Sequence, residues 1–156
     1  MQLVVSEKPS VRSSIAKVLG AHTRKDGYIE GSGYIISWCI GHLVAPAPPE
    51  EYDDRYRRWD ILDLPIVPDV WKYQVLKGTA KQFNLLKRLM NRRDVTEIIC
   101  AADAGREGEH IFRLVYNEAG CKKPFKRLWI SSLEEQSIRD GFSSLDDGDE
   151  FDYLYY

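Results

Sequence analysis

The sequence predicts an α/β fold in which helices flank a mainly parallel sheet, with an inserted β-hairpin and a long proline-rich loop. Short apolar runs alternate with amphipathic segments along the chain. Residues 98–102 form an uninterrupted apolar run, which is typical of a parallel strand buried on both faces. With 156 residues, 44% of them hydrophobic, the chain can bury one compact core. We therefore expect one domain at residues 1–150, followed by the truncated start of a further segment at residues 151–156.

The first elements are a strand and a helix. Residues 2–6 are mostly apolar and predict a buried first strand. Pro9 suits the first position of a helix and Gly20 suits its end. Between them, apolar residues recur at helical spacing: Val11, Ile15, Val18 and Leu19. The helix is therefore expected from residue 9 to residue 19.

Two insertions follow. Residues 28–39 predict two short strands joined by a Gly-Ser-Gly turn, a hairpin that we expect to be an ornament on the α/β core. Residues 41–68 contain five of the seven prolines together with clustered charges. Such a composition favours a long irregular loop over a helix or a central strand.

The remaining elements alternate again. A helix at residues 79–91 is expected to bury Phe83, Leu86, Leu89 and Met90. A strand at residues 97–102 and a helix at residues 107–117 come next, and Gly120 ends that helix.

A further strand and a last helix complete the predicted order. The strand is expected at residues 125–130. Ser132 and Glu135 resemble a capping box at the start of the helix. Its apolar residues are Ile138, Phe142 and Leu145.

Acidic residues follow two of the predicted strands. Glu7 comes after the first strand and Asp103 after the strand at 97–102, and the turn from Asp103 brings Glu107 close. The carboxyl ends of neighbouring parallel strands share one crevice. Carboxylate oxygens suit Mg²⁺, which takes one or two of them plus substrate phosphate. Taken singly, Glu7 also fits as a complement to a helix dipole and Asp103 as an N-cap.

The distribution of charge leaves two readings open. The net charge of −2 argues weakly against a nucleic-acid partner. From Lys77 to Arg93, however, there are six basic residues and no acidic one, Lys87 and Arg88 among them. This stretch is either a solvated helix face or a surface that binds DNA.

Three cysteines form no C-x-x-C pair and predict neither a disulfide framework nor a zinc site. The start of the chain lacks the pattern of a signal peptide, and no apolar segment is long enough to span a bilayer. We expect a cytoplasmic protein with no membrane partner.

Five stretches of the sequence carry a family pattern in the family's order: residues 3–10, residues 38–43, Trp59 with residues 64–68, residues 103–109 and residues 128–135. Together they resemble the Toprim domain, a Rossmann-like fold, of type IA DNA topoisomerases, closest to topoisomerase III. Members of this family are isomerases that cut one DNA strand through a tyrosyl-phosphate link, pass another strand through the gap and reseal the break.

The resemblance implies roles for individual residues. Glu7 would be the acid or base at the sugar 3′-oxygen and, with Asp103 and Glu107, a ligand of Mg²⁺. Lys8 would lie beside the scissile phosphate and Arg106 would contact DNA. The implied partners are DNA, preferentially single-stranded, and downstream domains of the same enzyme.

The sequence departs from the family pattern in two ways. The usual motif is Asp-x-Asp-x-Glu, and Gly105 replaces its second Asp, which removes one metal ligand. Glu109 is a candidate for a supporting role there. None of the nine tyrosines has the sequence context of the family's nucleophile, so we expect the chain by itself to be inactive.

Other functions fit parts of the pattern. The same fold with acidic strand ends serves primases and some nucleases, whereas the proline-rich insertion favours a topoisomerase. A phosphoacceptor signalling domain would need an adjacent acid pair after the first strand, and Lys8 follows Glu7 here. A non-catalytic DNA-binding module is the remaining alternative.

Overall fold

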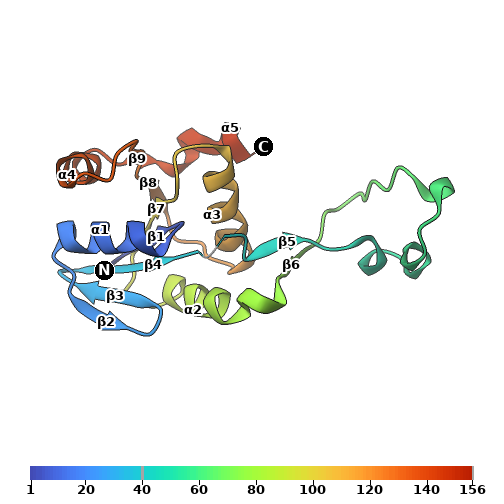
Figure 1. Ribbon diagram of the computed structural model, residues 1–156, viewed down its shortest axis with the longest axis horizontal. Coiled ribbons are helices and arrows are strands. Elements are labelled where there is room, and N and C mark those ends of the chain that lie inside the picture. Colours follow the sequence, from blue (N-terminus) through green and yellow to red (C-terminus); the bar gives the residue numbers. More distant parts are fainter. Residues whose placement is uncertain (40, 156) are drawn as a thin grey trace.

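A computed structural model describes residues 1–39 and 41–155 and contains a seven-stranded mixed sheet (Figure 1). Its strand order is β2-β3-β4-β1-β7-β8-β9, and the four strands from β4 to β8 are parallel to one another. The strands are β1 (Gln2–Ser6), β2 (Thr23–Lys25), β3 (Tyr28–Gly31), β4 (Tyr34–Trp38), β7 (Glu97–Ala101), β8 (Phe125–Arg127) and β9 (Asp146–Asp147). The predicted α/β class with a mainly parallel sheet is confirmed.

Helices cover both faces of the sheet. Apolar residues of α1 (Pro9–Leu19) and α4 (Glu135–Ser143) share one core cluster with one face of the strands. Residues of α2 (Ala80–Met90) and α3 (Arg106–Glu118) form the core on the opposite face. Two short elements, η5 (Gly148–Phe151) and α5 (Asp152–Tyr155), follow β9, and α5 packs against α3.

The predicted hairpin is present, but its place in the fold was predicted wrongly. β3 and β4 are joined at Ser32 and Gly33, both with positive φ, as a tight hairpin turn requires. Far from being an ornament, β4 lies inside the sheet and pairs in parallel with β1. Ile35 and Ile36 are adjacent and both fully buried, because a central strand is covered on its two faces.

The end of the predicted element order also needs correction. The strand expected at residues 125–130 ends at Arg127. The capping box is absent, since α4 begins at Glu135 after Glu134 as N-cap, without a side-chain cap. The Ser132 hydroxyl instead accepts a hydrogen bond from the Glu134 amide at 3.2 Å, which forms a local turn before the helix.

The proline-rich segment forms an arm that projects from the body of the molecule (Figure 1). Strands β5 (Val44–Pro46) and β6 (Tyr73–Val75) pair at its base. Beyond them lie three short 3-10 helices, η1 (Pro49–Glu51), η2 (Asp54–Arg57) and η3 (Ile61–Asp63), and η4 (Lys77–Thr79) leads into α2. We call residues 47–72 the arm. None of them is buried, so the arm adds nothing to the core.

Two further predictions concern cysteines and membranes. Cys39, Cys100 and Cys121 are free and buried, as expected of a chain without a disulfide framework. In the described part of the chain, every helix is too short or too polar to cross a bilayer. The motif at residues 38–43 includes Ile40, and the C-terminal segment includes Tyr156; both lie outside the described residues.

Candidate active site

Two parallel strands bring a glutamate and an aspartate together at the carboxyl edge of the sheet. Ser6, the last residue of β1, pairs in register with Ala101, the last residue of β7. Glu7 follows Ser6 directly, and Asp103 lies two residues beyond Ala101. One carboxylate oxygen of Glu7 accepts a hydrogen bond from the Asp103 amide at 3.1 Å. The reasoning from strand ends therefore located this pair correctly.

Lys8 adds a cation to the pair. Its ammonium lies 3.3 Å from the Asp103 carboxylate, and both side chains are more than half exposed. The hydrogen bond that the Lys8 ammonium donates to Asp103, followed by the negative charges of Asp103 and Glu7, raises the pKa of Lys8 above its ordinary value. Lys8 is therefore a permanent cation at neutral pH, suited to contact a phosphate and unsuited to act as a base.

Glu107 and Arg106 lie in the first turn of α3, and both are exposed. Glu107 approaches His42 instead of the other acids, with 3.7 Å between the His42 Nε2 and its carboxylate. Across residues 1–39 and 41–155, no three His, Cys, Asp or Glu side chains are gathered closely enough to hold a metal. The chemistry of the donors still suits Mg²⁺, because Glu7 and Asp103 are neighbouring, accessible carboxylates.

Glu109 lies on the inner side of the same helix. Its side chain is fully buried and forms ion pairs with the guanidinium groups of Arg113 and Arg127, at 2.8 Å and 3.2 Å. The Arg113 Nε also donates a hydrogen bond to the Glu109 carboxylate. The Arg127 Nε lies near the other carboxylate oxygen but does not form a hydrogen bond with it. In this arrangement Glu109 balances two buried positive charges.

Arg127 connects this buried network to the acidic loop. It is itself fully buried, and its guanidinium donates to the carbonyls of Ala102 and Asp103 at 3.0 Å and 2.8 Å. Arg127 was not among the predicted site residues. The only signal was a basic residue within the strand expected at residues 125–130.

Two glycines shape the loop between β7 and α3. A Cβ at Gly108 would lie 2.3 Å from the Asp103 carbonyl oxygen, so this close approach requires glycine. Gly105 has a φ of +149° and precedes the first residue of α3. A Cβ there would meet no atom within 4 Å, so space for a larger side chain exists although the backbone conformation favours glycine.

Lys87 and Arg88 lie on a different element. Both are exposed on α2, opposite the buried residues Phe83, Leu86, Leu89 and Met90, as the helical spacing predicted. In the described part of the chain, neither basic side chain forms an ion pair with the carboxylates at the edge of the sheet.

Comparison with known proteins agrees with this geometry. Residues 2–133 match the family model described as the Toprim domain. The chain is 49% identical over 152 residues to DNA topoisomerase 3 of Shouchella clausii and 46% identical over 154 residues to DNA topoisomerase 3 of Bacillus subtilis. These matches cover 97% and 99% of the chain and 21% of each relative, so the chain spans about a fifth of their length.

A solved structure has the same fold. The full-length topoisomerase I of Thermotoga maritima superposes on 95% of the chain with a TM-score of 0.60 and 21% identity, and 21% of that protein is covered. The matched residues, the parallel sheet and the acids at its carboxyl edge all lead to one conclusion. The chain belongs to the Toprim domain family.

Proposed function

We propose that this chain is the catalytic Toprim domain of a topoisomerase III-like type IA enzyme and supports transient cleavage and religation of single-stranded DNA. The observation that carries the proposal is the contact of Glu7, Lys8 and Asp103 at the edge of the sheet. A proton carrier, a fixed cation and a carboxylate are what phosphodiester exchange needs there. We place the end of the Toprim unit near residue 150.

In this proposal each residue has a separate task. Glu7 exchanges a proton with the sugar 3′-oxygen, and its hydrogen bond from the Asp103 amide orients the carboxylate toward the loop. Lys8 contacts the scissile phosphate, and Arg106 contacts the DNA backbone. Helix α1 begins at Pro9, just after β1, and helix α3 begins at Arg106, just after β7. Both helix N-termini therefore lie near this edge of the sheet, where their partial positive charge favours a phosphate.

We propose Mg²⁺ as the cofactor, with Asp103, Glu7 and Glu107 as its ligands. When bound, the ion would supply positive charge beside the substrate phosphate. Because few protein oxygens are available and Lys8 already pairs with Asp103, the free chain should bind Mg²⁺ weakly. Tight binding would then require the oxygens of a DNA phosphate.

A chimera tests the proposal. Residues 1–155 would replace the matching segment of DNA topoisomerase 3 from Shouchella clausii, and relaxation of negatively supercoiled DNA would be measured with and without Mg²⁺. We expect relaxation that requires Mg²⁺ and is lost in the Glu7→Gln chimera, because a neutral amide cannot exchange the proton.

The control is Glu118→Gln, an exposed residue at the far end of α3 that should leave relaxation unchanged. A folded chimera that does not relax DNA under conditions in which the parent enzyme does would contradict the proposal. Retention of activity by the Glu7→Gln chimera would contradict the role of Glu7.

A further inference from the structure

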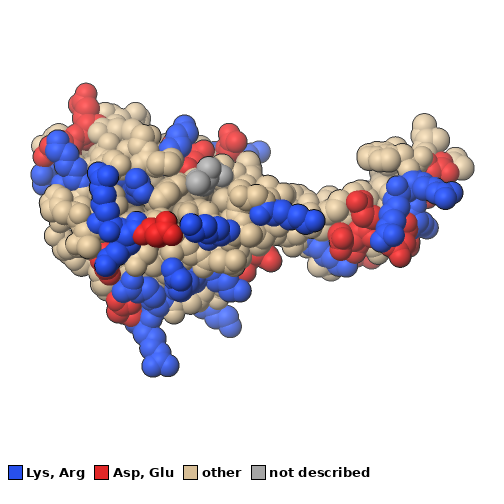
Figure 2. Space-filling model, turned by 60° about the horizontal axis from the view of Figure 1, so that its bottom comes forward, with Lys and Arg blue, Asp and Glu red and all other residues tan. Residues whose placement is uncertain are grey.

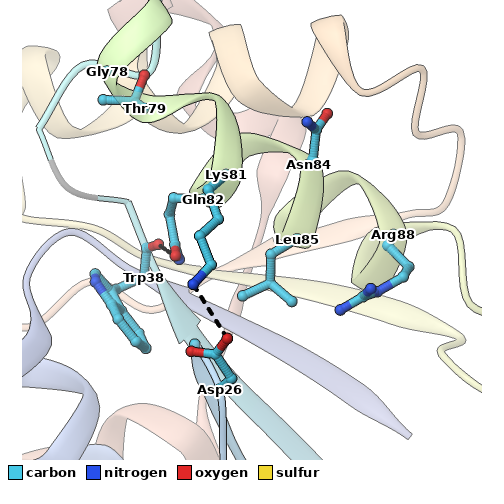
Figure 3. A pocket seen from close by; sticks show the side chains of 10 residues that line it. Asp26, Trp38, Gly78, Thr79, Lys81, Gln82, Asn84, Leu85 and Arg88 are labelled. Carbon is cyan, nitrogen blue, oxygen red and sulfur yellow. Dashed lines mark hydrogen bonds and ion pairs between the residues drawn. The ribbon is translucent and has the colours of Figure 1, made fainter.

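A cavity of about 660 Å³ lies between α2 and the hairpin of β2 and β3 (Figure 3). Lys81, Leu85 and Arg88 point from α2 toward Asp26 on the opposite side, and the Trp38 indole stands at one end. The volume lies within the range of small-ligand sites, and the lining combines an aromatic ring, an aliphatic side chain and two cations.

The charges around this cavity favour an anion. Arg88 forms no ion pair with any of the residues that the structure describes. Lys81 is paired with Asp26 at 3.3 Å, but both side chains are almost fully exposed, so an incoming anion can compete for Lys81. Figure 2 turns this side of the molecule forward, and on the body Lys and Arg side chains outnumber the acidic ones in this view.

The cavity is also close to the candidate active site in the topology of the sheet. Trp38 ends β4 and pairs in register with Ser6, the residue before Glu7. The Cys39 amide donates to the Ser6 carbonyl at 2.8 Å, and the Gln82 side chain donates to the Trp38 carbonyl at 2.6 Å. The wall of the cavity is thus tied to β1, the strand that directly precedes Glu7.

We propose that this cavity binds one nucleotide of the single DNA strand whose scissile phosphate lies at Glu7. The proposal rests on the function proposed above and adds a subsite to it. Arg88 and Lys81 contact the backbone phosphate, and the base packs against Trp38. The Arg12 guanidinium lies 4.1 Å from the centre of the Trp38 ring and places a third cation beside that aromatic surface.

Asp26 gives the proposal a distinctive consequence. Asp26 repels a phosphate, and because it pairs with Lys81 it also competes with the phosphate for that ammonium group. Removing the Asp26 charge should therefore tighten DNA binding, whereas removing the Arg88 charge should weaken it. A merely solvated helix face predicts no such difference between individual sites.

Binding of a fluorescein-labelled oligothymidylate of about ten nucleotides, followed by polarisation over a range of salt concentrations, tests the subsite. We expect Arg88→Glu to raise Kd about tenfold and to lower the slope of log Kd against log salt by about 0.7. Asp26→Asn should lower Kd. The matched control is Lys87→Glu, which makes the same charge change one residue away, outside the cavity lining, and should alter Kd less than about threefold.

A second measurement locates the base directly. Oligonucleotides carrying 5-iodouracil are cross-linked by light, and the attached peptide is identified by mass spectrometry. We expect the cross-link at Trp38. Cross-links confined to the other tryptophans, or equal effects of Lys87→Glu and Arg88→Glu, would overturn the subsite.

The outcomes also separate this inference from the proposed function. If Lys8→Ala weakens binding while Arg88→Glu and Asp26→Asn leave it unchanged, the subsite is wrong and the active site stands. If the oligonucleotide binds neither the parent protein nor any of the variants, both the subsite and the proposed function are wrong. The substitutions at Asp26, Lys87 and Arg88 affect exposed side chains, so circular dichroism is expected to show folded protein in every case.

Discussion

At the scale of single residues, Glu109 is the clearest case in which burial assigns a role. Glu109→Gln removes the buried negative charge that pairs with the guanidinium groups of Arg113 and Arg127. Because buried positive charges then lack this partner, we expect the free energy of unfolding to fall by about 3–5 kcal/mol. Urea denaturation measures this loss. Glu135→Gln is the control, because the pair of Glu135 with Arg139 is exposed and its loss should leave the urea midpoint nearly unchanged.

The same experiment distinguishes a structural from a ligand role for Glu109. Calorimetric titration with Mg²⁺ should give the same affinity for Glu109→Gln as for the parent under conditions in which both are folded. If the variant keeps its stability and loses Mg²⁺ binding, Glu109 is a metal ligand, and the acid missing at Gly105 has been replaced from a neighbouring position.

Gly105 carries the second prediction at this scale. Gly105→Asp should strengthen Mg²⁺ binding, since a carboxylate there has open space and stands at the position of the family's second Asp. The positive φ should lower stability by about 1–2 kcal/mol. Gly105→Asn is the matched control, with the same shape and no charge. Equal Mg²⁺ affinity of the two variants would argue against a missing ligand.

At the scale of elements, the sequence predicted the helices and strands in which apolar residues recur at a regular spacing. The helix at residues 9–19 and the strand at residues 2–6 were predicted with their observed bounds, and α2 begins and ends within one residue of the prediction. The hairpin was misplaced because pairing between β1 and β4 joins residues about 30 positions apart, and no local pattern encodes such a partner.

The arm offers a prediction for a whole element. Replacing residues 47–72 with a two-residue Asn-Gly turn joins β5 to β6 directly, and we expect the free energy of unfolding to change by less than about 1 kcal/mol. The reason is that none of these residues is buried. Urea denaturation tests this expectation. Loss of cooperative unfolding in the shortened protein would show that the arm stabilises the body.

At the scale of the whole molecule, the candidate site was predictable in part. The meeting of Glu7 and Asp103 follows from a general property of parallel sheets, so two strand ends in the sequence were enough. Glu109 was named as a candidate supporting residue, but its burial and its pairing with Arg127 were not predictable. The two residues are 18 positions apart on different elements, and charged residues are rarely buried unless paired, so neither position suggested an interior location.

The last prediction concerns the activity of the chain by itself. We expect the 156-residue chain to leave supercoiled plasmid intact in the presence of Mg²⁺. The reason is that strand cleavage needs a nucleophilic oxygen held in line with the phosphate, and none of the nine tyrosines has the family's sequence context. Gel electrophoresis of plasmid after incubation measures nicking and relaxation separately.

Tyr155→Phe is the informative variant, since Tyr155 lines a cavity with Arg106 and Glu107. Nicking that requires Mg²⁺ and disappears in Glu7→Gln would favour a nuclease, and its disappearance in Tyr155→Phe would identify that hydroxyl as the nucleophile.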